Sequence, residues 1–490
     1  MRVIIVRNTH RGNSLYLLCF VNGPPDHSIS TNILYHGKYI SPSHFELFII
    51  AGFYIPRSNM QSTTWPERFV DLKRQIVEAT PDYEKRLTES WKDLLGELDK
   101  RTADIAQAGP NYIPQVRYED LDKLSVEEVD IIRRKGTVVI KDVVDDSEAR
   151  AWKTALDDFV KANPHVQGFP EQDKQFFMLY WTRPQVQARA HPNVLKASAW
   201  LNKQYHVKSG KPLEGVDLNV PLVYADRFRI RHPGPGWNNF PPHVDGGAIE
   251  RWEDESFRKC FADILSGNWR AHDPYELEGR LDARSSLYGR PGQATIFRSY
   301  QGWLAMSEAA PTQGTLRVFP DLVLSNAYTI LRPFFRPTVP LDSEDLLKPE
   351  NWVFDISTPD FPGILIHPTG FSGPRPTPEV HPHLRLEKTM TSVPKVNPGD
   401  MVFWHCDVVH SVEEEHTGQE DSAVMYIGAV PQTPMNTEYV KKQAETFLAG
   451  INPPDFVKDQ PNTTYVGLGA DTDVKEHIAR VAMGLPIQVA

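Results

Sequence analysis

The stretch GDMVFWHCDVVHSV (residues 399–412) opens on a Gly-Asp turn pair, continues as an apolar, β-branched run and ends near a histidine. Similar runs separated by Gly, Pro and Asn occur at RFRIRH (227–232), QATIFRSYQGWLAMSEA (293–309), TLRVFP (315–320) and SAVMYIGAVP (422–431). Short strands at this spacing are typical of a β-sandwich or a double-sheet jelly roll. We therefore expect a mainly β core.

The segments on either side of this core have a sequence pattern typical of helices. We expect an α+β protein, mainly β with flanking helices, whose parts are an N-terminal helical region (63–215), a jelly-roll core (216–435) and a helical tail (436–490). A Pro-rich segment (325–398) is predicted to be an insertion that covers one mouth of the barrel. Residues 1–62 look like an atypical extension outside the fold, with disorder as one interpretation and a cleaved targeting peptide as the less favoured one.

The segment 124–164 shows how the helical region leads into the core. Its pattern predicts a helix that ends at Gly136, a β-branched strand TVVI, and a second helix that opens at Asp146-Ser147 with acidic residues in its first turn.

Bulk properties exclude several classes of partner. The 490-residue chain has a net charge of −10, which argues against nucleic acid or an anionic membrane as the main partner. No run reaches the roughly 18 to 20 apolar residues of a membrane span. Cys19, Cys260 and Cys406 are widely separated and form no CxxC pair, so we expect a reduced, cytoplasmic location.

A candidate metal site lies in NNFPPHVDGG (238–247). His243 and Asp245 are two positions apart, so on a strand their side chains point to the same face. On a regular strand His405 and His410, five apart, face opposite sides, and we favour His410 as third ligand because it lies at the strand end; the pair His405–Asp407 keeps the alternative open. Two histidines and a carboxylate form the facial triad of non-haem Fe(II) oxygenases.

Other interpretations must be weighed against an iron site. A lone His-x-Asp is mostly a surface turn, and His381 and His383 lie in a loop-like segment where we expect exposed or turn-capping side chains. A zinc hydrolase is disfavoured because the chain has no HExxH, GxSxG or P-loop motif. A jelly-roll protein that binds a sugar or an organic acid without oxidative catalysis remains the alternative function.

Three blocks in this order, PPHVDGG, GWLAMSEAAPTQGTLRVFP and PGDMVFWHCDVVHSV, resemble the signatures of Fe(II)/2-oxoglutarate-dependent dioxygenases of the phytanoyl-CoA-hydroxylase type, particularly the uncharacterised YbiU-like branch. The resemblance spans residues 124 to 432. It implies a double-stranded β-helix with Fe(II) on His243, Asp245 and His410, and 2-oxoglutarate and dioxygen as co-substrates. The implied activity is oxidation of a small organic metabolite, and Asp245 favours hydroxylation, because halogenating relatives lack this carboxylate.

The sequence departs from that pattern after the last histidine. Many such enzymes hold the distal carboxylate of 2-oxoglutarate with an arginine on the next strand, yet residues 411–431 contain no Arg or Lys. A buried dicarboxylate favours the bidentate fork of an arginine. We expect Arg298 or Arg317 to supply it, with Arg231 third; Arg229 and Arg231 alternate with apolar residues, so one face of their strand is basic.

Overall fold

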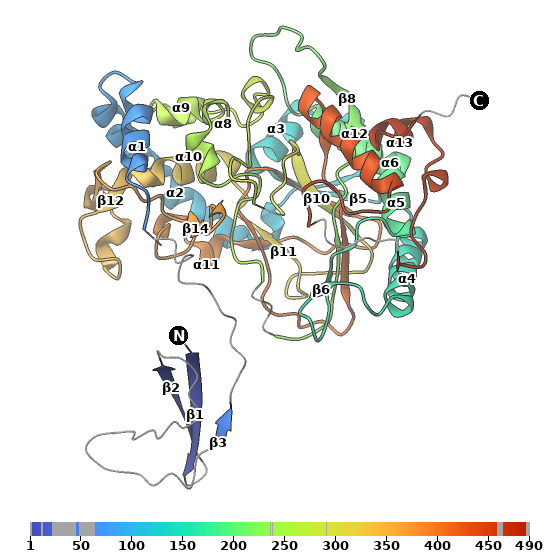
Figure 1. The fold of residues 1–490 in the computed structure, drawn as a ribbon. Helices are drawn as coiled ribbons and strands as arrows, with labels where there is room; N and C mark the ends of the chain where they lie inside the picture. Colours follow the sequence, from blue (N-terminus) through green and yellow to red (C-terminus); the bar gives the residue numbers. More distant parts are fainter. Residues whose placement is uncertain are drawn as a thin grey trace. The chain divides into compact units, whose positions relative to one another are not determined.

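The computed structural model describes residues 2–10, 13–21, 46–48, 64–235, 237, 239–290, 292–457 and 464–486 (Figure 1). The chain divides into two compact units, Met1–Ser62 and Thr63–Ala490. In the first, β1 (Arg2–His10) pairs antiparallel with β2 (Asn13–Val21) and with β3 (Glu46–Phe48). The prediction of disorder for residues 1–62 falls largely outside the described residues.

The second unit is built on an eight-stranded sheet of order β4-β5-β17-β10-β19-β9-β7-β6. Its strands are β4 (Gln115–Arg117), β5 (Thr137–Lys141), β6 (Gly168–Phe169), β7 (Phe176–Phe177), β9 (Phe228–Arg231), β10 (Tyr300–Ala305), β17 (Met401–His405) and β19 (Ser422–Tyr426). Neighbouring strands are antiparallel except β4 and β5. All of β10 and β17 is buried, because both faces of the sheet are covered.

A smaller antiparallel sheet has the order β16-β11-β18 and consists of β11 (Leu316–Val318), β16 (Thr391–Ser392) and β18 (His410–Val412). An antiparallel bridge between His243 and His410 places the chain around residue 243 beside β18. The remaining strands form two-stranded ladders: β8 (Asp217–Leu222) with β20 (Val430–Gln432), β12 (Phe335–Pro337) with β13 (Trp352–Phe354), and β14 (Leu365–His367) with β15 (Gly370–Ser372).

Local sequence signals fix the entry into the large sheet. The helix α3 (Val126–Lys135) starts with a capping box between Ser125 and Glu128 and ends at Gly136, whose φ of 67° requires the left-handed region. The strand β5 follows, and Asp145 caps α4 (Asp146–Ala162) by accepting from the Ser147 N–H. The predicted helix, strand and helix of this segment are confirmed.

Helices pack around the sheets in two groups. Figure 1 shows α1 (Arg68–Glu78) and α2 (Tyr83–Ala108) at one side of the unit, and α4, α12 (Pro434–Leu448) and α13 (His477–Ala482) at the other. The others are α5 (Arg183–Ala190), α6 (Pro192–Asn202), α7 (Glu250–Glu253), α8 (Glu255–Lys259), α9 (Ala262–Leu265), α10 (Leu322–Leu331) and α11 (Leu386–Thr389). None of the described helices is both long and apolar enough to cross a membrane.

The Pro-rich segment 325–398 contains more regular structure than its composition suggests. It holds most of α10, α11 and the strands β12 to β16, and it packs on α2, where Trp91 stacks on Phe335 with ring centroids 4.5 Å apart. His381 and His383 are buried here, at 0% and 5% exposure. The expectation that they are exposed is therefore wrong, because the first two helices cover this segment.

Candidate metal centre and its cavity

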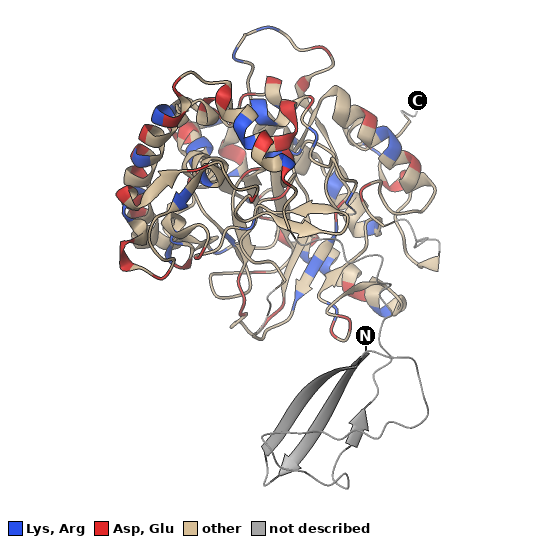
Figure 2. Cartoon of the chain, turned by 60° about the vertical axis from the view of Figure 1, so that its left-hand side comes forward, with Lys and Arg blue, Asp and Glu red and all other residues tan. Residues whose placement is uncertain are grey.

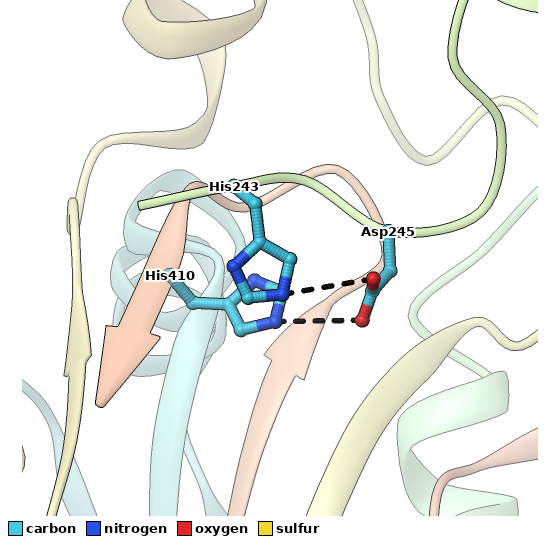
Figure 3. A group of neighbouring side chains, drawn as sticks. All are labelled: His243, Asp245 and His410. Atoms are coloured by element: carbon cyan, nitrogen blue, oxygen red, sulfur yellow. Dashed lines mark ion pairs between the residues drawn. The ribbon is translucent and has the colours of Figure 1, made fainter. Parts of the chain in front are cut away.

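His243, Asp245 and His410 converge on one point (Figure 3). The Asp245 carboxylate faces both imidazoles, with Oδ1 3.6 Å from His243 Nε2 and Oδ2 3.5 Å from His410 Nε2. One candidate ligand atom from each residue lies within 4.8 Å of the other two. This spacing and this donor set fit a single metal ion held by two nitrogens and one carboxylate.

Backbone pairing holds the two histidines in register. The His243 N–H donates to the His410 carbonyl and the His410 N–H donates to the His243 carbonyl, both at 2.9 Å. After Asp245 the chain turns sharply through Gly246 and Gly247, whose φ angles are 72° and 108°. A Cβ on Gly247 would lie 2.7 Å from Phe257 Cε1, so the double glycine after the ligand pair is a geometric requirement.

Hydrogen bonds fix the tautomer of both histidines. His243 Nδ1 donates to the Pro241 carbonyl at 2.7 Å, and His410 Nδ1 donates to the Val408 carbonyl at 3.0 Å. A carbonyl oxygen can only accept, so each Nδ1 carries a proton, and in the neutral ring the Nε2 atom is left free to bind a metal ion. This orientation by a backbone carbonyl is common for metal-binding histidines.

The electrostatics also suit a divalent cation. Burial, with the neighbouring His410, lowers the pKa of His243 to about 4. Burial alone would raise the pKa of Asp245, but His243, His410 and Arg298 hold it well below its ordinary range. The site therefore offers the neutral imidazole of His243 and an ionised carboxylate at neutral pH, the forms that bind metal.

Two residues of the large sheet orient the Asp245 carboxylate through hydrogen bonds. Gln301 on β10 and Trp404 on β17 are cross-strand partners. The Gln301 side-chain N–H donates to Asp245 Oδ2 at 2.8 Å, while its amide oxygen accepts from Trp404 Nε1 at 3.3 Å. The carboxylate orientation is thus tied to the two central strands.

A buried ion cluster links the two ligand segments. Arg251 donates from Nη2 to the Asp245 carbonyl at 2.9 Å and from Nη1 to Asp407 Oδ1 at 2.6 Å. Arg280 donates to the other oxygen of Asp407. His405, Cys406 and Asp407 form a second group with metal-ligand spacing, but its carboxylate is already bound by two arginines.

The metal centre lines a cavity of about 180 Å³. Its apolar wall includes Phe176, Phe240, Trp303, Leu316 and Val412. Its polar lining residues include Arg227, Arg229, Arg290, Arg298 and Arg375. The cavity therefore combines dry walls with a high density of cationic donors.

The three arginines predicted to bind a carboxylate have different positions. Arg298 lines the cavity, with Nη1 4.0 Å from Asp226 Oδ2. Arg317 donates from Nε and Nη2 to the Met390 carbonyl, and Arg231 donates to the carbonyls of Glu413 and Glu414. Neither of these two lines the cavity, because backbone carbonyls hold their guanidinium groups elsewhere.

The sequence prediction ranked Arg229 too low. Arg229 is 2% exposed and lines the cavity from β9. Its Nη2 donates to the Gly314 carbonyl at 3.1 Å, while its Nε and Nη1 have no hydrogen-bond partner. A buried guanidinium with two free donors is what an incoming carboxylate would satisfy.

Comparison with known proteins places the chain in a family. The model of the Gig2-like family matches residues 63–485, nearly all of the second unit. The chain belongs to the Gig2-like family. It is 28% identical over 447 residues to the uncharacterised protein YbiU of Escherichia coli (strain K12), covering 88% of this chain and all of YbiU, which supports the YbiU-like part of the resemblance seen in the sequence.

Solved structures of Gig2-like relatives share the fold. The GlcNAc Inducible Gene 2 product of Candida albicans is 32% identical with a TM-score of 0.75, covering 87% of this chain and 91% of its own. The "Putative Oxidoreductase" of Salmonella typhimurium LT2 is 27% identical with a TM-score of 0.71, covering 86% of this chain and 99% of its own. The name of the second relative points to redox chemistry without stating a substrate.

Proposed function

We propose that this Gig2-like protein is a non-haem Fe(II)/2-oxoglutarate-dependent oxygenase that oxidises a small organic molecule. The observation that carries the proposal is the convergence of His243, Asp245 and His410 on a cavity that also contains the buried, partly unsatisfied Arg229. Each half of the site matches one of the two groups that such an enzyme must bind.

The donor set supports iron over zinc. Two imidazole nitrogens and one carboxylate, all presented from one side, are the ligands of the facial triad, which leaves positions for other ligands. The three residues fit such an ion, because both Nε2 atoms are acceptors and the carboxylate is held by Gln301. A structural zinc site would more often include thiolates and a fourth protein ligand.

The strand order supports a double-stranded β-helix as the core. In chain order the eight core strands are β9, the segment at His243, β10, β11, β16, β17, β18 and β19. The first, third, sixth and eighth lie in the large sheet, and the second, fourth, fifth and seventh lie with the small sheet. This alternation is that of a jelly roll, in which a metal centre sits at one mouth of the barrel.

Arg229 supports 2-oxoglutarate as the co-substrate. It pairs with Val424 of β19, the strand that follows the last histidine ligand, so it lies beside the place where many related enzymes carry their arginine. A dicarboxylate could chelate a metal at one end and accept from one of the free donors of Arg229, Nε or Nη1, at the other. The missing basic residue in 411–431 is then replaced from the adjacent strand.

The remaining side chains would orient the reactants and exclude water. Bound iron would supply the activation of dioxygen, which no amino-acid side chain provides. The apolar wall, including Phe240, Trp303 and Leu316, keeps the space beside the ligands dry, which strengthens the ion pair between Arg229 and a carboxylate.

Metal analysis and co-substrate turnover test the proposal. The parent protein should bind one equivalent of Fe(II) and convert 2-oxoglutarate to succinate, at least slowly without a substrate. His243→Ala, Asp245→Ala and His410→Ala should each lose the iron, whereas the control His405→Gln should keep it. Retention of iron by all three ligand variants, or a metal-free parent after incubation with Fe(II), would overturn the proposal and favour a non-oxidative binding protein.

A further inference from the structure

The cavity has a charge opposite to that of the protein. Among the described residues, five arginines but only two carboxylates, Asp226 and Asp245, line it, although the whole chain has a net charge of −10. Acidic and basic residues are mixed along the outer helices (Figure 2). Such a concentration of one sign in a concave site favours a ligand of the opposite sign.

Most of these charges already have a partner or a role. Asp226 Oδ1 accepts from Arg227 Nε at 2.8 Å, and Asp226 Oδ2 forms an ion pair with Arg298 Nη1 at 4.0 Å. Asp245 belongs to the metal centre, and Arg229 is assigned above to the co-substrate. Two arginines, Arg290 and Arg375, are left over.

Within the described residues, the side chains of Arg290 and Arg375 make neither a hydrogen bond nor an ion pair. Arg375 is exposed to solvent, whereas the Nε of Arg290 is buried without a partner. A buried guanidinium donor without an acceptor, such as the Nε of Arg290, is expected to bind one, and Arg375 adds a second cationic group at the same cavity. In the part of the chain that the structure describes, the carboxylates that line the cavity are Asp226 and Asp245, both already accounted for.

Two neighbouring loops carry these arginines to the metal centre. Val244, which lies between the first two ligands, donates its N–H to the Pro374 carbonyl at 2.9 Å, so Arg375 is one residue from a contact with the ligand segment. The loop of Arg290 packs on the hairpin of β14 and β15, which lies just before Arg375 in the chain, with the rings of Tyr288 and Phe371 5.1 Å apart. Arg290 and Arg375 thus approach the cavity from adjoining loops.

We propose that Arg290 and Arg375 bind an anionic group, a carboxylate or a phosphate, of the molecule that is oxidised. The inference rests on the proposed function and narrows its substrate class to organic anions. Both groups accept paired hydrogen bonds from guanidinium, so the two residues select charge and leave the choice between carboxylate and phosphate open to measurement.

Calorimetric titration with three probes of similar size tests this inference. Phenyl phosphate, benzoate and the neutral benzyl alcohol are titrated into the full-length protein and into the double variant Arg290→Gln/Arg375→Gln. Arg150→Gln, which removes an exposed arginine paired with Asp146 on α4, is the matched control. The parent and the control should bind at least one anion about tenfold or more tightly than the alcohol, and the double variant should lose that preference.

The arms of the experiment separate the possible results. Preference for phenyl phosphate alone assigns a phosphate, preference for benzoate alone assigns a carboxylate, and preference for both supports the inference for organic anions in general. Equal binding of all three probes by the parent, or an unchanged preference in the double variant, would overturn the inference. A parallel titration with Fe(II) and 2-oxoglutarate keeps the two proposals apart, because the double variant should bind both like the parent.

The double variant Arg290→Lys/Arg375→Lys guards against a folding artefact. It keeps both charges but lacks the bidentate fork, so it should retain part of the preference for anions. If the glutamine and lysine variants lose all preference alike while their thermal unfolding matches that of the parent, charge recognition by these residues is contradicted.

Discussion

At the scale of single residues, the geometry of the candidate metal centre depends on side chains that are not themselves candidate ligands. Gln301 bridges the Asp245 carboxylate and the Trp404 indole, and it is only 4% exposed. Its role is to fix one carboxylate orientation. Outer hydrogen bonds of this kind affect metal affinity by about 10- to 100-fold.

Replacing Gln301 by methionine tests this role, because the two side chains have similar length and Met adapts to its surroundings. Gln301→Met should lower the affinity for Mn(II) or Fe(II) by about 10- to 100-fold, since Asp245 loses a donor. Competition with a chelator under anaerobic conditions measures the change. Trp404→Phe removes only the hydrogen bond from Trp404 to Gln301, so it should lower the metal affinity less. An unchanged metal affinity in Gln301→Met would contradict the role assigned to Gln301.

The residue types of the candidate ligands could be read from the sequence, but the sequence did not show which cavity arginine is buried with free donors. His243 and Asp245 share a face by strand periodicity alone. Arg229 and Arg231 share a face too, and only their distant partners distinguish them: Arg231 binds carbonyls of Glu413 and Glu414, whereas Arg229 keeps two donors free. Such long-range pairing cannot be deduced from local pattern.

At the scale of elements, the central strands require a close approach of backbones. Gly302 on β10 lies opposite Phe403 of β17. A Cβ at this position would lie 2.4 Å from Phe403 Cδ1 and 2.7 Å from the Ile427 carbonyl oxygen. The glycine therefore sets the spacing of the strands that carry Gln301 and Trp404.

Two glycine substitutions form a matched pair. Gly302→Ala should destabilise the protein by about 1 to 3 kcal/mol through overpacking. Gly96→Ala, at an exposed position of α2 with no atom within 4 Å of the added Cβ, should stabilise it by about 0.5 to 1 kcal/mol. Urea unfolding measures both changes. Similar stabilities for the two variants would show that β10 and β17 are not so tightly packed.

The choice of His410 over His405 had an incorrect geometric reason. One regular strand was predicted to contain both, on opposite faces. Instead β17 ends at His405, a turn follows, and β18 begins at His410 in the other sheet. The turn is stabilised by the buried pairs of Asp407 with Arg251 and Arg280, residues more than a hundred positions away, so no local signal could reveal it.

At the scale of the whole molecule, several buried histidines couple stability to pH. Burial lowers the pKa of His381, His383 and His405 to about 3 and that of His272 to about 4. Below the unfolded pKa of about 6.5 the unfolded chain binds protons that the folded protein excludes. The free energy of unfolding should therefore fall as pH drops from about 6.5 toward 4, by up to about 1.4 kcal/mol per pH unit and histidine.

His381→Leu isolates one of these contributions, because neither ring nitrogen of His381 has a hydrogen-bond partner. The variant should unfold like the parent at pH 7 but lose less stability at pH 5. Denaturant midpoints at the two pH values measure this difference. An acid response identical to that of the parent would mean that His381 is not neutral and buried as described.

The central claim is that one cavity binds both a metal, on His243, Asp245 and His410, and a dicarboxylate, on Arg229. The most direct measurement is an anaerobic titration of 2-oxoglutarate into the Fe(II)-loaded protein, followed by the visible charge-transfer band that a chelated 2-oxo acid produces. The parent should develop the band at saturating 2-oxoglutarate. Because truncating a buried ion pair typically costs about 3 to 5 kcal/mol, Arg229→Gln should need at least about a hundredfold more 2-oxoglutarate while keeping its iron. A parent that binds iron but shows no band, or an Arg229→Gln variant that titrates like the parent, would contradict the account.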